Sequence, residues 1–185
     1  ERHVSLVSGT SICRALRSRG HQAILVDMFL GLEHYKGALA DIFEAPDGLM
    51  GDAAIEAAAP DLDAVRASRA DQGASLFGKD VLAVCAMADM VFLGLHGACG
   101  EDGRVQAAFD LLGIPYTGAG YLGSGMAMDK AVTKYTMERA GIPTAPWGDI
   151  PSYTREDIPR LIEELEVPCA VKIINGGSSL GVALP

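Results

Sequence analysis

The sequence predicts an α/β protein with a mostly parallel sheet, because short apolar runs alternate with longer segments of helical spacing. Four short runs are interpreted as strands: residues 22–28 (QAILVDM), 91–95 (VFLGL), 114–117 (IPYT) and 167–174 (VPCAVKII). In open α/β sheets, ligands bind beyond the carboxyl ends of the strands. The loops that follow 91–95 and 167–174 are therefore the first places to expect a site.

Apolar residues at helical spacing predict the helices between these strands. The predicted helices span residues 5–18, 74–88, 105–112, 129–140 and 155–166. Gly20, Gly113 and Gly141 stand where three of them should end, because glycine adopts the left-handed conformation beyond a helix C-terminus without strain. Thr154 and Asp157 have the spacing of a capping box at the start of the last helix.

Two parts of the chain are less regular. Residues 29–73 are rich in Ala, Asp, Gly and Pro without a strong period, and they are interpreted as a variable insertion with room for one helix. The run Gly118-Ala119-Gly120 marks a predicted domain boundary. A chain of 185 residues and 19.3 kDa suits one large domain or two small ones.

Composition and charge exclude several classes of protein. Apolar residues make up 49% and charged residues 21%, which excludes fibrous and disordered chains. A net charge of −9 without a Lys/Arg run argues against duplex nucleic acid or an anionic membrane as a partner. The most apolar stretch, residues 81–95, is interrupted by Asp89 and is shorter than the roughly 20 residues of a membrane span.

The cysteines and the first residues predict a compartment. Cys13, Cys85, Cys99 and Cys169 form no C-x-x-C pair, which argues against a disulfide framework or a zinc site. The charged first residues show no signal-peptide pattern. We therefore expect reduced thiols and a cytoplasmic location.

The first candidate site is the loop HGACGEDG at residues 96–103. Its glycines allow backbone N–H groups to approach a ligand, and an imidazole at a strand end can bind a carboxylate or move a proton. His96 is therefore a candidate functional residue. Asp102 precedes the next helix, which is the usual place of a structural cap.

The second candidate site is the loop NGGSSLG at residues 175–181. Its N–H groups and hydroxyls suit phosphate oxygens, although it is not a Walker A loop. The alternative is an ordinary hairpin turn. Lys172, in an apolar strand just before the loop, favours phosphate, because a buried lysine needs an anionic partner. Lys130 opens a helix where an anion is preferred, and a phosphate nearby would explain it.

Three ordered blocks resemble the D-alanine–D-alanine ligases, which are ATP-grasp enzymes. They are ERHVSLVSG from Glu1, the stretch from LHGACGEDGRVQ through LLGIPYTGAG to AMDKAVTK, and VKIINGGSSLGV from Val171. The resemblance implies a Rossmann-like pre-ATP-grasp domain at residues 1–119 that lacks its first strand. The first part of an ATP-grasp domain would follow at 120–185. It also implies synthesis of D-alanyl-D-alanine for peptidoglycan precursors through an acyl phosphate.

The resemblance also implies roles for the matching residues. Glu1 would hold the ammonium group of the first D-alanine, Ser178 would join it in a hydrogen-bonded network, and His96 would line the same pocket. Lys130 and Lys172 would contact the ATP phosphates. The loop that closes over the nucleotide would contain Gly176, Gly177, Ser179 and Gly181.

The chain also departs from the family pattern. The resemblance places the magnesium ligands, the arginine of the second substrate site and a mobile-loop tyrosine beyond Pro185, so we expect a fragment of a ligase, inactive alone. His3 and Ile173 replace an acid and a proline. The family also implies a homodimer. Three alternatives stay open: a ligase that joins D-lactate or D-serine, another ATP-grasp ligase, and a non-catalytic half-protein that binds nucleotide.

Overall fold

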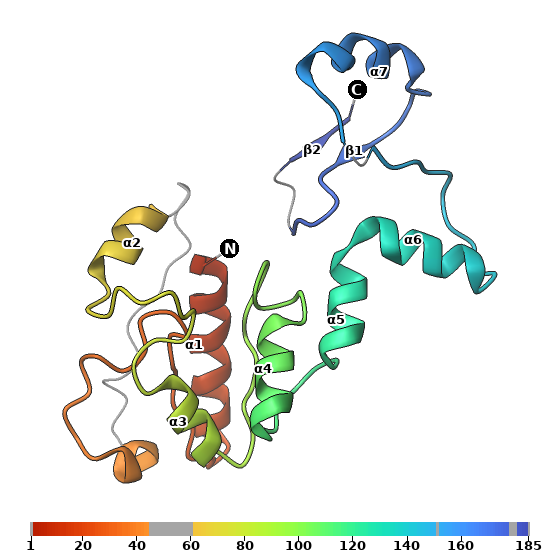
Figure 1. Cartoon of the computed structure of the whole chain (residues 1–185). Helices are drawn as coiled ribbons and strands as arrows, with labels where there is room; N and C mark the ends of the chain where they lie inside the picture. Colours follow the sequence, from red (N-terminus) through yellow and green to blue (C-terminus); the bar gives the residue numbers. More distant parts are fainter. Residues whose placement is uncertain (1, 45–60, 151, 178–180, 185) are drawn as a thin grey trace. The chain divides into compact units, whose positions relative to one another are not determined.

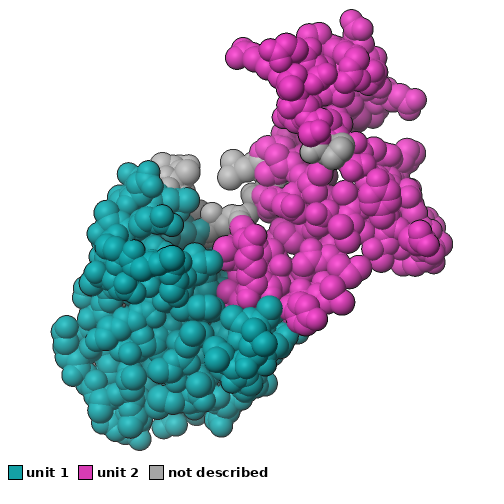
Figure 2. All heavy atoms as spheres, viewed as in Figure 1, with its two compact units in different colours: residues 1–96, 106–118 teal, residues 97–105, 119–185 magenta. Residues whose placement is uncertain are grey.

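The computed structural model describes residues 2–44, 61–150, 152–177 and 181–184. Within these ranges the protein is rich in helix and has one small sheet (Figure 1). The chain divides into two compact units (Figure 2). Unit 1 comprises residues 1–96 and 106–118, and unit 2 comprises residues 97–105 and 119–185. No helix in the described ranges has the length and apolar character needed to cross a bilayer.

The helices of unit 1 agree best with the sequence prediction at the residues where they end. They are α1 (Arg2–Ser18), the 3₁₀ helix η1 (Leu39–Glu44), α2 (Leu62–Ser68), α3 (Val81–Met87) and α4 (Arg104–Leu112), whose first two residues belong to unit 2. Gly20 ends α1 with a φ of +86°, and its N–H donates to the Arg17 carbonyl at 2.9 Å. The N–H of His21 donates to the Leu16 carbonyl at 3.2 Å, which completes a Schellman motif. The predicted end of the first helix is confirmed.

The core of unit 1 places the segment 91–95 beside α1. Leu32, Ile42 and Val84 form a buried cluster, and Ile42 is fully buried. A Cβ atom on Gly94 would lie 3.4 Å from the Cα atom of Gly9 in α1. The segment 91–95 therefore runs in van der Waals contact with α1, and the residue after it, His96, lies next to that helix.

The strands predicted for unit 1 do not form a sheet in the described residues. Residues 91–95 and 114–117 meet in one parallel bridge between Val91 and Tyr116, in which Thr117 N–H donates to the Val91 carbonyl at 3.0 Å. Residues 22–28 form no ladder with a second segment; at their end the Asp27 carbonyl accepts from Gly31 N–H and the Met28 carbonyl accepts from Gly78 N–H, each at 2.8 Å. The prediction of a strand at 22–28 is wrong, because an apolar run becomes a strand only where a second backbone pairs with it.

The predicted helix at 74–88 begins later than expected, at Val81. The residues before it pair with residues 28–32: the Lys79 carbonyl accepts from Leu32 N–H at 3.0 Å. A Cβ atom on Gly78 would lie 2.5 Å from the Phe29 carbonyl oxygen, so glycine is required at this contact. The backbone of residues 78–79 is therefore hydrogen-bonded to residues 28–32. The apolar spacing of the sequence does not reveal this pairing.

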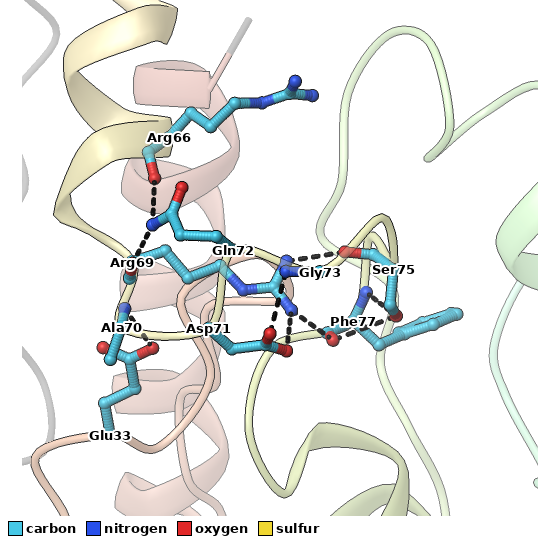
Figure 3. Close-up of polar contacts among 9 residues, drawn as sticks. All are labelled: Glu33, Arg66, Arg69, Ala70, Asp71, Gln72, Gly73, Ser75 and Phe77. Carbon is cyan, nitrogen blue, oxygen red and sulfur yellow. Dashed lines mark hydrogen bonds and ion pairs between the residues drawn. The ribbon is translucent and has the colours of Figure 1, made fainter.

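The region 29–73, predicted as a variable insertion, contains η1 and α2 in its described part. It also contains Arg69, whose polar contacts are drawn in Figure 3. The side chain of Arg69 is 2% exposed. Its guanidinium donates to the carbonyls of Ser75 at 2.6 Å and Phe77 at 3.0 Å, and to the Asp71 carboxylate at 3.2 Å. It also lies 5.0 Å from the ring centroid of Phe29. Arg69 thus fixes the loop 70–77, because its donors satisfy carbonyls that have no helix or strand partner.

Unit 2 contains α5 (Tyr121–Met128), α6 (Lys130–Arg139), the 3₁₀ helix η3 (Arg155–Asp157) and α7 (Ile158–Glu164). The predicted capping box is confirmed: Asp157 accepts from Thr154 N–H at 2.8 Å and from its hydroxyl at 2.9 Å. Asp129 caps α6 by accepting from Val132 N–H at 2.9 Å. The helical spacing of the sequence does not reveal α5, because each glycine inside it lowers helix propensity by about 1 kcal/mol.

The sheet of unit 2 is an antiparallel pair. Strand β1 (Val171–Lys172) pairs with β2 (Val182–Ala183), with Val171 opposite Ala183 and Lys172 opposite Val182. The predicted strand at 167–174 is thus reduced to two residues, because only these find a partner. The alternative interpretation of the loop 175–181, a hairpin connection, describes this pairing correctly. Both strands are exposed.

Candidate functional site

His96 is held by two serines of α1. Its backbone N–H donates to Ser5 Oγ at 3.0 Å, and its ring Nε2 lies 3.0 Å from Ser8 Oγ. The two serines are three residues apart, so they lie on the same face of the helix one turn apart. The His96 side chain is otherwise exposed. The imidazole therefore has a fixed orientation and remains accessible to a ligand.

Sequence reasoning found His96 but missed Ser5 and Ser8. Both lie inside the block ERHVSLVSG, and their spacing on a predicted helix was visible. Nothing in the sequence joined them to a residue about 90 positions away, because that contact depends on how residues 91–95 pack against the helix.

The acidic side chains of the loop 97–103 bind the loop's own backbone. Glu101 accepts from Gly97 N–H at 2.6 Å, and Asp102 accepts from Cys99 N–H at 2.8 Å. Asp102 also accepts from the backbone N–H of Arg104 at 3.3 Å and pairs with its guanidinium at 3.2 Å. A hydrogen bond to Cys99, followed by the charge of Asp102, raises the pKa of the Arg104 guanidinium. These contacts support the structural role predicted for Asp102.

Two glycines of this loop have backbone conformations that favour glycine. The φ angles are +78° at Gly97 and +87° at Gly103. A Cβ atom on Gly103 would lie 2.3 Å from the carbonyl oxygen of Tyr121, at the start of α5. Gly97 and Gly103 are therefore favoured by the loop's shape, whatever the loop binds.

Lys130 joins the first residue of α6 to the glycine-rich loop. Its Nζ donates to the Gly176 carbonyl at 2.7 Å and to the Ile174 carbonyl at 3.2 Å. Its backbone N–H also donates to the Ile174 carbonyl, at 3.3 Å. An ammonium group has three N–H donors, so these side-chain contacts leave one for another acceptor. The structure thus brings together two of the features that sequence reasoning assigned to phosphate binding.

The prediction that Lys172 lies in a buried strand is wrong. The side chain is exposed, as are its neighbours Val171 and Ile173, at 41% and 52%. A hairpin of two short strands has no second layer over it in the described residues, so water solvates the ammonium group. Burial therefore gives no reason to place an anion at Lys172.

The loop after Lys172 folds over Ile173. A Cβ atom on Gly176 would lie 2.4 Å from Ile173 Cδ1, and one on Gly181 would lie 3.2 Å from Ile173 Cγ2. Gly181 also has a φ of +73°. Gly176 and Gly181 therefore both lie against the Ile173 side chain.

Three predicted site residues, Glu1, Ser178 and Ser179, lie outside the described residues. Their assignments stay predictions. Among the residues that are described, no three His, Cys, Asp or Glu side chains gather as metal ligands.

Comparison with known proteins gives the family. The model of the family described as D-ala D-ala ligase N-terminus matches residues 1–119. A D-alanine–D-alanine ligase from Lacticaseibacillus casei is 39% identical over 181 residues, which cover 98% of this chain and 50% of that protein. One from Pediococcus pentosaceus is 42% identical over 186 aligned positions, which cover 100% of this chain and 52% of that protein.

A solved D-alanine–D-alanine ligase from Bacillus anthracis is 36% identical, with a TM-score of 0.47 over 57% of this chain and 34% of that one. From the match over residues 1–119, the chain belongs to the D-alanine–D-alanine ligase family. It spans about half the length of the curated relatives it matches.

Proposed function

We propose that this chain forms the amino-acid-binding and the first nucleotide-binding parts of an ATP-dependent ligase that joins two D-alanines. The observation that carries the proposal is the family match over residues 1–119, together with relatives named D-alanine–D-alanine ligase along almost the whole chain. The product, D-alanyl-D-alanine, would enter peptidoglycan precursors in the cytoplasm.

The two parts of the chain would divide the work. Residues 1–119 would form a Rossmann-like pre-ATP-grasp domain that holds the first D-alanine. Glu1 would bind its ammonium group, since a carboxylate is the natural partner of that cation. His96 would line the same pocket, and Ser178 would join the hydrogen-bonded network. Residues 120–185 would begin the ATP-grasp domain.

The contacts of Lys130 support a phosphate site in the second part. Its ammonium group is ordered by the carbonyls of Ile174 and Gly176 and keeps one N–H for a phosphate oxygen. Lys172 would supply a second positive charge. The backbone N–H groups of the loop that contains Gly176, Gly177, Ser179 and Gly181 would bind the remaining oxygens.

The proposed reaction has two steps. A carboxylate oxygen of the first D-alanine attacks the γ-phosphorus of ATP, the bond to the β-phosphate breaks, and ADP leaves. The amine of the second D-alanine then attacks the resulting acyl phosphate, a peptide bond forms, and phosphate and one proton leave. Because an acyl phosphate hydrolyses readily, the glycine loop would exclude water while it exists. Magnesium, which the resemblance implies, would neutralise phosphate charge, and no described residue is assigned to it.

The test is a coupled assay of ADP release with the full-length ligase that contains this chain. We expect release only when D-alanine is present, together with D-alanyl-D-alanine detected by mass spectrometry. L-Alanine is the control for the stereochemistry of the site. Release that does not depend on D-alanine would overturn the proposal.

The same assay decides between this proposal and the alternative second substrates. Mixtures of D-alanine with D-lactate or D-serine would give a depsipeptide or a mixed dipeptide if the alternative is correct. Nucleotide binding without any product would favour the non-catalytic half-protein.

A further inference from the structure

The hydroxyl of Ser8 contacts a ring nitrogen and not a carbonyl of its own helix. Ser18 and Ser68 donate to the carbonyls of Ala15 and Val65, each at 2.8 Å, as hydroxyls on helices commonly do. Ser8 Oγ makes no such bond in the described part of the chain. Its contact is with His96 Nε2, at 3.0 Å. The proton of the Ser8 hydroxyl is therefore available to the imidazole.

This contact has a consequence for the ring of His96. A neutral imidazole carries one proton, so one ring nitrogen donates and the other accepts. If the hydroxyl donates to Nε2, the ring proton must lie on Nδ1. The backbone contact between His96 N–H and Ser5 Oγ fixes the main chain at the same point. Two residues of one helix would thus determine both the position and the tautomer of the ring.

We propose that Ser8 is a positioning residue that donates to His96 Nε2 and so presents Nδ1–H to the substrate. The inference rests on the proposed function for the identity of that substrate. The first D-amino acid carries a carboxylate, which only accepts hydrogen bonds, so a ring that binds it must offer a donor. With Nε2 occupied by Ser8, the exposed side chain can offer Nδ1–H.

The first test measures the tautomer by long-range ¹H–¹⁵N NMR of the full-length ligase labelled at histidine nitrogens. His96→Gln identifies the resonances of His96. The spectra are recorded at about pH 8.5, about two units above the reference imidazole pKa of about 6.5. We expect the Nδ1–H form in the wild type and in Ser8→Thr, which keeps the hydroxyl. Ser8→Ala should shift the ring toward Nε2–H.

Ser11→Ala provides the matched control, because Ser11 is an exposed serine of the same helix. It should leave the tautomer unchanged. A wild-type ring in the Nε2–H form, or an unchanged ratio in Ser8→Ala, would overturn the inference. Neither outcome depends on whether the protein is a ligase.

The second test is kinetic. Loss of one positioning hydrogen bond should raise the KM for the first D-alanine between about two- and tenfold in Ser8→Ala, with little change in the KM for ATP. Ser8→Thr should restore the wild-type value. Equal changes in both constants would show that the substitution acts on the fold and would overturn the positioning role. Absence of ligase activity in the wild type would instead refute the proposed function and leave the NMR result to decide the tautomer.

Discussion

Replacement of Gly103 by alanine should destabilise the protein more than the same change at Gly113 or Gly148. Two costs combine at this position. The φ of +87° is left-handed, which costs an L-residue about 1–2 kcal/mol. The new Cβ atom would also lie 2.3 Å from the carbonyl oxygen of Tyr121, which belongs to the backbone and cannot rotate away. Displacing α5 adds an overpacking cost of about 1–3 kcal/mol, so the total is about 2–5 kcal/mol.

Two other glycines separate these costs. Gly113 has a φ of +65° but open space around it, so Gly113→Ala should cost only the conformational part, about 1–2 kcal/mol. Gly148 has neither a left-handed φ nor a neighbour within 4 Å of a new Cβ atom. Gly148→Ala should therefore be neutral or stabilise by up to about 1 kcal/mol, through the entropy of the unfolded chain.

The assay is equilibrium urea unfolding of the three variants of the protein, followed by circular dichroism. With a slope of about 2 kcal/mol per molar urea, Gly103→Ala should lower the midpoint by about 1–2.5 M. Gly113→Ala should lower it by less. If Gly103→Ala and Gly113→Ala gave equal shifts, the contact with Tyr121 would carry no cost and the reasoning would be refuted.

Two further predictions concern unit 2. Lys130→Met removes two charged hydrogen bonds from a half-buried side chain, worth together about 1–2 kcal/mol. In Lys130→Met, backbone hydrogen exchange at residues 174–177 should become about 5- to 30-fold faster. The control is Lys134→Met, which loses contacts to residues 144–145 and should leave the exchange at 174–177 unchanged. Hydrogen bonds from the Thr154 N–H, then the Thr154 hydroxyl and Arg160, lower the pKa of Asp157. The hydrogen bonds of the Asp157 carboxylate therefore stabilise the folded protein fully above the ordinary pKa of 3.8. This stabilisation is lost as the pH falls through the lower pKa of Asp157 in the folded state. By NMR, the Thr154 amide proton should titrate with a midpoint below 3.8, and Asp157→Asn should abolish that titration.

Helix ends could be predicted from the sequence because their signals are local. Gly20 and the pair Thr154–Asp157 act within one turn of the helices that they limit, and the structure has them where the sequence indicated. Strands could not be predicted equally well. The run at residues 22–28 is as apolar as the run at 91–95, but only the second finds a parallel partner, and partner choice depends on the fold as a whole.

The candidate site shows the same division between local and distant information. His96 and Lys130 could be chosen by residue type and position next to glycine-rich loops. Their partners could not, because Ser8 lies 88 positions from His96 and Gly176 lies 46 positions from Lys130. The apolar neighbours of Lys172 in the sequence predict a buried side chain. Its exposure depends instead on which residues cover the hairpin, and neighbours in the sequence do not reveal those residues.

Lys130 and Lys172, which are proposed to bind phosphate, differ in how firmly their side chains are held before a ligand binds. Lys130 is held by the carbonyls of Ile174 and Gly176, so most of its side-chain entropy is already lost in folding. Lys172 is exposed, and ordering it on a phosphate would cost up to about 2 kcal/mol. Because Lys130 is also bonded to the loop that would cover the nucleotide, its contact with a phosphate would be coupled to the position of that loop. Lys172 would contribute mainly charge, which salt screens.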